Sequence, residues 1–302
     1  MSITVRTPAK VNLQLSVGPL RDDGYHDLVT VFHAVSLQDT ITATSMADGS
    51  GIELTMVGEG AEGLPVDEAN LAYRAAELLA SDAGIDPDVA LDIDKAIPIA
   101  GGMAGGSADA AGTLVACDAL WRTGYSRDRL AHLAAQLGSD VPFALYGGNA
   151  IGRGRGEEIT PILGRGRFHW VFALADGGLS TPEVYGKCDE LRGDQAVPEP
   201  AVTSELLQAL RSGDAQALAG AMHNDLQAAA LALRPQLRSL LDSGLEFGAL
   251  AAVVSGSGPT CAFLVRDDEH ALDVAVALTA TGSCRTVKRA TGPANGAQVM
   301  SS

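Results

Sequence analysis

The amino-acid sequence predicts an α+β protein built from two domains. A chain of 302 residues is long enough for two hydrophobic cores of ordinary size. Helical patterns and short strand patterns are mixed, without the regular strand–helix repeat of a doubly wound parallel sheet. We therefore expect antiparallel sheets packed with helices, divided near residue 160 into the units 1–160 and 161–302.

Strand patterns dominate the N-terminal part of the chain. β-Branched residues at strand spacing predict strands at residues 3–6, 11–17, 29–37, 39–44 and 52–57. The turn signal Asp22-Asp23-Gly24 separates the second of these from the third. Asn70 suits the N-cap of a first helix at residues 70–83, and a further strand follows at residues 89–93.

Helices become more frequent in the remainder of the chain. An Ala-rich helix begins at Ser107 and runs to about Leu120, and a second helix, residues 127–137, ends at Gly138. A glycine-rich hairpin covers residues 147–155. The other expected elements are strands at 170–175, 251–254, 261–265 and 284–289, and helices at 182–191, 204–211, 215–230, 235–243 and 269–279.

The formal net charge of −16 excludes some classes of partner. Nucleic acids and anionic membranes bind basic surfaces, so we expect neither as a partner. An acidic protein that takes an anionic ligand must gather its few cations locally. Lys10, Lys95, Lys187 and Lys288 are the only lysines, so each is a candidate for such a role.

Cysteine usage and hydropathy indicate the compartment. The four cysteines are widely separated and form no C-x-x-C pair, which argues against a zinc site and against a dense disulfide framework. The N-terminus lacks the pattern of a signal peptide, and no apolar run approaches the ~20 residues of a membrane span. We expect a cytoplasmic protein whose cysteines are mostly small core residues.

One glycine-rich run lies between a predicted strand and a predicted helix. It reads Pro98-Ile99-Ala100-Gly101-Gly102-Met103-Ala104-Gly105-Gly106-Ser107-Ala108. Its backbone N–H groups can approach a large anion, and the helix that follows adds free N–H groups and a positive dipole end. The run lacks the lysine of a P-loop and the spacing of the dinucleotide fingerprint. It predicts a phosphate cradle, with a flexible linker as the alternative.

Three other segments carry side chains suited to chemistry. Lys10 and Asn12 are two apart in a strand, so they face the same side and can reach one ligand; an exposed strand edge is the alternative. Tyr25 and His26 follow a turn, for which an ordinary surface turn is the other interpretation. Asp140 is a lone carboxylate at a helix end, where helix capping is the other interpretation.

Taken in order, five motifs closely resemble those of the GHMP kinase superfamily. They are Pro-Ala-Lys-Val-Asn-Leu (8–13), Gly-Tyr-His (24–26), Pro-x-x-Gly-Gly-x-x-Gly-Gly-Ser (98–107), Gly-Ser-Asp-Val-Pro-Phe (138–143) and Ser-Gly-Ser-Gly-Pro-Thr (255–260). The resemblance spans residues 3 to about 289. It implies the two-domain GHMP kinase fold, a ribosomal protein S5 domain 2-like N-terminal domain followed by a ferredoxin-like α/β-sandwich.

Within the superfamily, the match is to the branch that acts on a cytidine diphosphate-linked methylerythritol. This implies ATP-dependent phosphorylation of the 2-hydroxyl of that compound in the non-mevalonate route to isoprenoid precursors. Asp140 would be the base on the hydroxyl, and Lys10 the cation near the hydroxyl and the γ-phosphate. General-base help contributes about 10²–10⁴-fold, and phosphoryl transfer depends on charge stabilisation, so the residue types suit these roles.

The resemblance also implies binding residues at both ends of the site. Residues 98–108 would hold the triphosphate of ATP with Mg²⁺ bridging its oxygens, and Ser107 is a candidate ligand of that metal. Asn70 and Lys95 lie in segments that flank the adenine pocket in relatives. Tyr25 would stack on one face of the cytosine and Tyr185 on the other, and His26 would form hydrogen bonds to the base. The residues implied for the acceptor substrate are Asn12, Tyr25, His26, Thr181 and Tyr185.

Two alternative functions remain at this stage. Another GHMP kinase, of the homoserine or mevalonate type, would share the glycine run but not the pair Tyr25 and His26, which favours a pyrimidine nucleotide acceptor. A non-catalytic ATP-binding regulator would not need both Lys10 and Asp140. The sequence is compatible with a monomer or a homodimer.

Overall fold

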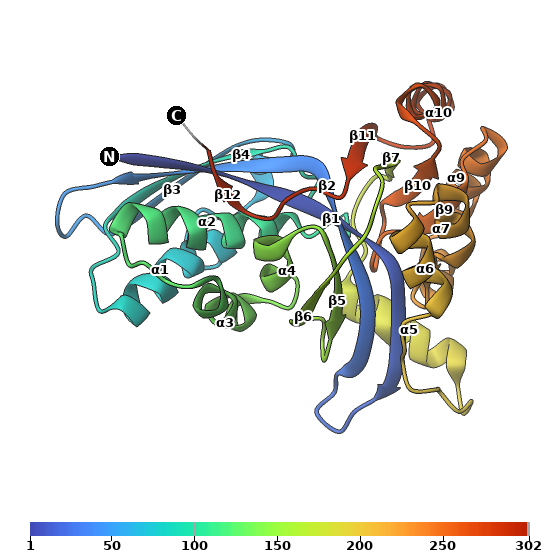
Figure 1. Ribbon diagram of the computed structural model, residues 1–302, viewed down its shortest axis with the longest axis horizontal. Coiled ribbons are helices and arrows are strands. Elements are labelled where there is room, and N and C mark those ends of the chain that lie inside the picture. Colours follow the sequence, from blue (N-terminus) through green and yellow to red (C-terminus); the bar gives the residue numbers. More distant parts are fainter. Residues whose placement is uncertain (100, 301–302) are drawn as a thin grey trace.

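Two β-sheets with helices packed against them form the molecule (Figure 1). The computed structural model describes residues 1–99 and 101–300. Ala100, a predicted member of the glycine run, lies outside the described residues. In the part of the chain that is described, no helix combines the length and the apolar character needed to cross a bilayer.

The first sheet is built around one long antiparallel pair, β1 (Ser2–Leu20) and β2 (His26–Ser45). The prediction of two separate strands at 3–6 and 11–17 was wrong, because β1 runs through both; β2 likewise joins 29–37 to 39–44. A register shift after Pro8 explains the continuity. At such a bulge the strand tolerates a residue without a backbone N–H.

Six shorter strands complete the first sheet. They are β3 (Ile52–Gly58), β4 (Val89–Lys95), β5 (Asn149–Arg153), β6 (Glu158–Ile162), β8 (His223–Asn224) and β12 (Gln298–Val299). The main order is β12-β1-β2-β4-β3, with β5 on β2, β6 on β5, and β8 on β1. Since β8 and β12 come from the C-terminal part, the chain returns to the first sheet twice. The division at residue 160 stays a prediction.

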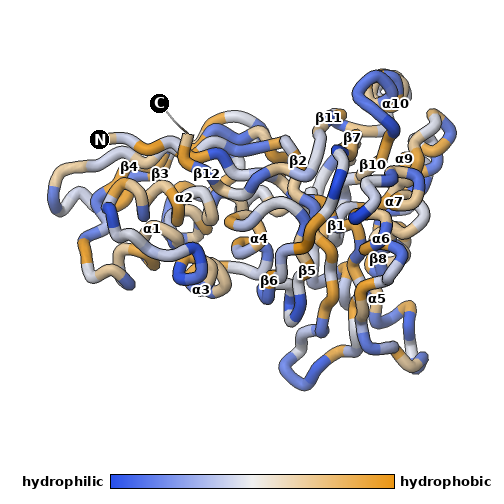
Figure 2. The backbone as a smooth tube through the Cα atoms, in the orientation of Figure 1, coloured by the Kyte–Doolittle hydropathy of each residue, from blue (hydrophilic) through white to orange (hydrophobic). Residues whose placement is uncertain are grey.

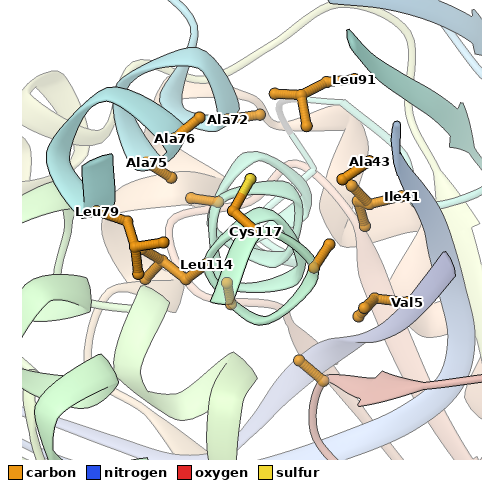
Figure 3. Packing of buried hydrophobic residues seen from close by; sticks show 14 of the residues in the cluster. Val5, Ile41, Ala43, Ala72, Ala75, Ala76, Leu79, Leu91, Leu114 and Cys117 are labelled. Atoms are coloured by element: carbon orange, nitrogen blue, oxygen red, sulfur yellow. The ribbon is translucent and has the colours of Figure 1, made fainter. Parts of the chain in front are cut away.

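The helix α2 (Gly105–Trp121) lies at the centre of the first core. Figure 3 shows it end-on, with Val5, Ile41 and Leu91 of the sheet on one side and residues of α1 (Leu71–Ala83) on the other. Most of the helix is apolar and buried, and Cys117 is fully buried in it. A Cβ at Gly112 would lie 2.5 Å from both Ile41 Cδ1 and Thr7 Oγ1, so α2 packs directly on the sheet.

Local signals predict most of the helix ends around this core. Asn70 caps α1 by accepting a hydrogen bond from the backbone N–H of Ala72, as predicted. The helix α3 (Arg127–Leu137) has the predicted bounds. The helix α2 begins two residues before the predicted Ser107, so Gly105 and Gly106 form its first turn. The short helix α4 (Val141–Tyr146) and the 3₁₀ turn η1 (Ala61–Gly63) were not predicted.

The second sheet has four antiparallel strands in the order β11-β7-β10-β9. Their bounds are β7 (Phe168–Leu174), β9 (Ala251–Val254), β10 (Cys261–Val265) and β11 (Thr286–Gly292). The helices of this half are α5 (Thr181–Arg192), α6 (Ser204–Ser212), α7 (Ala215–Ala221), α8 (Gln227–Leu233), α9 (Gln236–Glu246) and α10 (Asp268–Ala280). Hydrophilic stretches appear on α3 and α10 at the periphery (Figure 2). The strand order matches the ferredoxin-like arrangement that was expected.

One predicted helix of this half was wrong. Instead of a single helix over 215–230, the chain forms α7, the strand β8 and α8. The Asn224 amide donates to the carbonyl oxygens of Val254 and Gly256, both at 2.8 Å, and its Oδ1 accepts from the N–H of Leu226. Here β8 pairs with β1 in parallel. These long-range bonds interrupt a segment whose composition favours a helix.

Candidate active site

A cleft of about 1170 Å³ brings the predicted site residues together. Those that line it are Lys10, Asn12, Tyr25, His26, Asn70, Lys95, Pro98, Ile99, Gly101, Gly102, Ala104, Gly105, Gly106, Ser107, Asp140, Thr181 and Tyr185. Met103 and Ala108 do not line it, because their side chains are fully buried in the apolar core. The cleft therefore runs from the start of α1 past the glycine run to α5.

Lys10 and Asp140 form an ion pair on one wall of the cleft. Lys10 Nζ lies 3.6 Å from Asp140 Oδ2, and the two side chains are 7% and 32% exposed. Lys10 is therefore not an exposed strand-edge residue. Asp140 precedes α4 but makes no capping hydrogen bond with its side chain. The carboxylate is directed to the lysine, and the helix-capping interpretation is wrong.

A chain of hydrogen bonds orients Lys10. Its Nζ donates to Asn12 Oδ1 at 2.8 Å, which confirms that the two side chains share a face of β1. Asn12 Nδ2 donates to Thr30 Oγ1 at 2.7 Å, and this hydroxyl donates to the carbonyl of Gln14 at 2.8 Å. The ammonium group also lies 5.7 Å from the centre of the Phe32 ring. The lysine is thus held in one place by buried polar and aromatic groups.

The glycine run is fixed at both of its faces. The backbone N–H of Lys10 donates to the carbonyl of Met103 at 3.2 Å, and Ser255 Oγ donates to the carbonyl of Gly102 at 3.1 Å. Gly102 has φ 71°, and a Cβ there would lie 2.0 Å from the carbonyl oxygen of Ser255. Only glycine suits that position. The described part of the run is packed, so the flexible-linker interpretation is wrong.

The end of the run becomes the N-terminus of α2. Ala104, with φ 61°, is its N-cap and provides no side-chain hydrogen bond to the helix. The first-turn N–H groups, those of Gly105, Gly106 and Ser107, are the ones an α-helix leaves without an internal acceptor. All three residues line the cleft. Free N–H groups and the helix dipole together make this a site for an anion.

Lys95 is held beneath the run by two carboxylates. Its Nζ donates to Asp39 and, at 2.6 Å, to Asp109 Oδ2, and all three side chains are buried. Asp39 Oδ1 also accepts from the N–H groups of Ala96 and Ile97. The network ties β4 to α2 across the start of the run. Burial raises the pKa of Asp109, and its Oδ1 has no hydrogen-bond partner among the described residues.

Aromatic side chains gather at the opposite end of the cleft. His26 and Tyr185 have ring centres 5.2 Å apart, and Tyr25 is 53% exposed. His26 Nε2 lies 2.9 Å from Asp189 Oδ1, which leaves Nδ1 for another partner. Burial, together with the charge of Asp140, raises the pKa of the Tyr185 hydroxyl. This end offers flat, partly buried surfaces to a planar ring.

The helix α5 presents one row of side chains to the aromatic end. Thr181, Tyr185 and Asp189 are four residues apart in sequence, which places them on one face of the helix. All three line the cleft. Thr181 Oγ1 lies 2.9 Å from Ser257 Oγ, so the helix also meets the second glycine-rich loop, residues 255–260. The spacing to Tyr185 is the signal that could have identified Asp189.

Other residues of the cleft were not predicted from the sequence. Thr30, Asp109 and Arg155 all line it. Arg155 places its guanidinium 5.3 Å from the centre of the Tyr25 ring. No group of three or more His, Cys, Asp or Glu side chains within residues 1–99 and 101–300 could hold a metal ion. Local sequence carries no signal for Thr30 or Asp109, because their partners are distant in the chain.

Known proteins resemble the chain over nearly its whole length. The GHMP kinases N terminal domain family matches residues 70–148, and the GHMP kinases C terminal family matches residues 206–284. A 4-diphosphocytidyl-2-C-methyl-D-erythritol kinase of Mycolicibacterium smegmatis is 58% identical, over 99% of this chain and 92% of that protein. One of Streptomyces avermitilis is 57% identical, over 99% of this chain and 100% of that protein.

The fold is shared as well. The crystal structure of a 4-(cytidine 5′-diphospho)-2C-methyl-D-erythritol kinase superposes with a TM-score of 0.79 at 33% identity, covering 95% of this chain and 98% of that one. This confirms the two-domain α+β fold predicted from the motifs. With both family domains and full-length relatives above half identity, the chain belongs to the GHMP kinase family.

Proposed function

We propose that the protein transfers the γ-phosphoryl group of ATP to the 2-hydroxyl of 4-diphosphocytidyl-2-C-methyl-D-erythritol, giving the 2-phosphate and ADP. This step belongs to the non-mevalonate route to isoprenoid precursors. The observation that carries the proposal is the Lys10–Asp140 pair, at 3.6 Å, between an anion-binding helix N-terminus and an aromatic pocket. The names of the most similar relatives support the choice of acceptor.

The chemistry follows from the two charged side chains. Asp140 accepts the proton of the substrate's 2-hydroxyl. The hydroxyl oxygen forms a bond to the γ-phosphorus, and the bond from that phosphorus to the oxygen of the departing ADP breaks. Lys10 stabilises the negative charge on the transferring group and the attacking oxygen. The hydrogen bond from Lys10 Nζ to Asn12 supports a fixed position for that charge before the reaction begins.

The donor nucleotide would lie along the glycine run. The described residues of 98–108 that line the cleft, with the N–H groups of Gly105, Gly106 and Ser107, would hold the triphosphate, and Asn70 and Lys95 would flank adenine. Lys95 would act mainly through the network that fixes the run, because both carboxylates already bind its ammonium group. Its side chain is buried rather than directed to a free ligand.

Mg²⁺ would accompany ATP and neutralise charge on the phosphates. Oxygen donors suit this ion, which usually binds through substrate phosphates and only one or two protein groups. Ser107 lines the cleft, and Asp109 Oδ1 is a buried oxygen with no hydrogen-bond partner among the described residues, so the donor chemistry fits. Ser107 is the proposed protein ligand of this ion.

The acceptor would lie at the aromatic end. Tyr25 and Tyr185 would stack on the two faces of cytosine, and His26 would bond the base through Nδ1, since Asp189 takes Nε2. Asn12 and Thr181 would contact polar groups of the substrate. We further propose that the protein acts in the cytoplasm as a monomer or homodimer and binds no nucleic acid, for which its charge of −16 is unsuited.

A substrate panel tests the proposal. Purified protein is incubated with ATP, Mg²⁺ and either the cytidine compound, homoserine or mevalonate, and ADP is measured. We expect ADP only with the cytidine compound, and phosphorus NMR should place the new phosphate on the 2-oxygen. Equal turnover of homoserine or mevalonate would defeat the acceptor assignment. No ADP with any acceptor, alongside intact ATP binding, would favour a non-catalytic regulator.

A further inference from the structure

Arg155 lies at the acceptor end of the cleft, on the turn between β5 and β6. Its guanidinium is 5.3 Å from the centre of the Tyr25 ring, and its side chain is 42% exposed. Its Nε donates to Glu157 Oε1 at 3.4 Å in a long ion pair, and no described residue accepts a hydrogen bond from its two Nη atoms. The fork of the guanidinium is therefore available to a ligand in the cleft.

The turn that carries Arg155 is well fixed. Gly154 and Gly156, on either side, have φ 69° and 109°, and the N–H of Arg155 donates to Glu157 Oε2 at 2.6 Å. The carbonyl of Gly154 accepts from the N–H of Leu28, which ties the turn to the start of β2. This bond to the start of β2 holds the arginine next to Tyr25.

The turn also approaches the reacting end of the site. A Cβ at Gly156 would lie 3.9 Å from Ser139 Cβ, and Ser139 precedes Asp140. The guanidinium of Arg155 thus lies over the ring proposed for cytosine, while the backbone next to it approaches the segment that carries the carboxylate proposed for the 2-hydroxyl. In the substrate, the group between cytidine and methylerythritol is the diphosphate.

The lining of the cleft offers few cations to a second anionic group. Among the described residues of the cleft, Lys10, Lys95 and Arg155 are the only lysines and arginines. Lys95 is already bound by two carboxylates, and Lys10 is paired with Asp140. The acceptor end also contains the carboxylates of Asp23 and Asp189. Without Arg155, a diphosphate placed there would meet Asp189 and Asp23, the latter already paired with Arg21, and no other lining cation at that end.

We propose that Arg155 binds the diphosphate of the acceptor substrate and so selects a nucleoside diphosphate over an uncharged nucleoside. The guanidinium can donate two parallel N–H hydrogen bonds to phosphate oxygens. Its contact with the Tyr25 ring places the group that binds the diphosphate beside the ring that stacks on cytosine. The inference rests on the proposed function, because it takes the cytidine compound as the acceptor. It adds a specificity residue that acts on binding rather than on the transfer itself.

Binding of cytidine and of CDP to matched variants tests the role. For Arg155→Met, which keeps the apolar stem, CDP affinity should fall about ten- to a hundredfold, the size of a lost charged hydrogen bond. Cytidine affinity should fall no more than about fivefold, the size of an exposed cation–π contact. Arg155→Lys should lie between wild type and Arg155→Met for CDP. In turnover assays, Arg155→Met should raise KM for the acceptor and leave kcat and KM for ATP unchanged.

Arg153→Met is the control, because Arg153 is an exposed arginine at the end of β5 that does not line the cleft. It should change neither affinity. Equal weakening of cytidine and CDP in Arg155→Met would overturn the inference, since the arginine would then only support Tyr25. Unchanged CDP binding would overturn it too. Wild-type protein that neither binds CDP nor turns over the cytidine compound would instead defeat the proposed function.

Discussion

Lys10 Nζ and Asp140 Oδ2 lie 3.6 Å apart, although one residue belongs to the first strand and the other precedes a short helix beyond α3. The lysine is buried and bonded to Asn12, whereas the carboxylate is about one-third exposed to the cleft. One partner is therefore fixed and the other is accessible to a substrate. A catalytic base must be accessible to the hydroxyl that it deprotonates, whereas a cation that stabilises charge must be held in a fixed position.

Asp140→Asn should abolish most of the turnover. The amide keeps the size of the carboxylate but cannot accept the proton, so kcat should fall by about 10²–10⁴-fold. Affinity for ATP should change little, because the glycine run is held by Lys10 N–H and Ser255 rather than by Asp140. Single-turnover kinetics and ATP titration measure the two effects. Turnover within tenfold of wild type would remove Asp140 from the role of base.

Thr30→Val should impair catalysis indirectly, through the position of Lys10. The variant keeps the shape of Thr30 but leaves Asn12 Nδ2 without its buried acceptor, which should cost about 1–3 kcal/mol of the free energy of unfolding. The looser Asn12 should lower kcat several-fold through Lys10, while KM for ATP stays unchanged. Steady-state kinetics and urea unfolding are the measurements.

The control for this change lies in the same strand pair. Thr4 and Thr42 also share a hydroxyl contact across β1 and β2, at 3.1 Å, but do not line the cleft. Thr4→Val should leave kcat at the wild-type value. If Thr4→Val and Thr30→Val lowered kcat equally, the hydrogen-bond chain would have no part in positioning Lys10.

Local sequence signals predicted the elements whose causes are local. The bounds of α3, the N-cap at Asn70 and the shared face of Lys10 and Asn12 all follow from residues close together in the chain. The broken helix over 215–230 had a distant cause, the bonds from Asn224 to the loop after β9. The composition of residues 215–230 alone does not predict these hydrogen bonds.

In the site, too, local sequence patterns predicted some features, whereas others depend on contacts between distant segments. The motif residues were found because their types and spacing resemble a family pattern, and the fold brings most of them to one cleft. The Asp39–Lys95–Asp109 network and the contact of Arg155 with Tyr25 join distant segments. Met103 and Ala108 belong to the motif for packing, since their side chains lie in the core. A motif identifies a segment, whereas the fold decides which side chains face the ligand.

Gly102→Ala should destabilise the protein and weaken ATP binding, whereas Gly106→Ala should leave the fold intact. At Gly102 a Cβ would lie 2.0 Å from a backbone oxygen, and φ is 71°. The left-handed conformation alone costs about 1–2 kcal/mol for a residue with a side chain. At Gly106, in α2, the nearest atom to a Cβ is Leu71 Cδ1 at 3.7 Å. Urea unfolding of both variants checks this; equal losses of stability would contradict it.

The free energy of unfolding should decrease as the pH is lowered, because of the buried imidazole of His33. His33 is fully buried, and burial lowers its pKa to about 4 from 6.5, although a bond to Asn149 opposes this. Since the unfolded chain takes up the proton first, stability is lost as pH falls from about 6.5 to 4, by up to about 3 kcal/mol from this group. His33→Gln should flatten that part of the curve of unfolding free energy against pH, measured with urea. His132→Asn, at an exposed histidine, should keep the wild-type slope. Equal slopes for wild type and His33→Gln would show that His33 does not control acid stability.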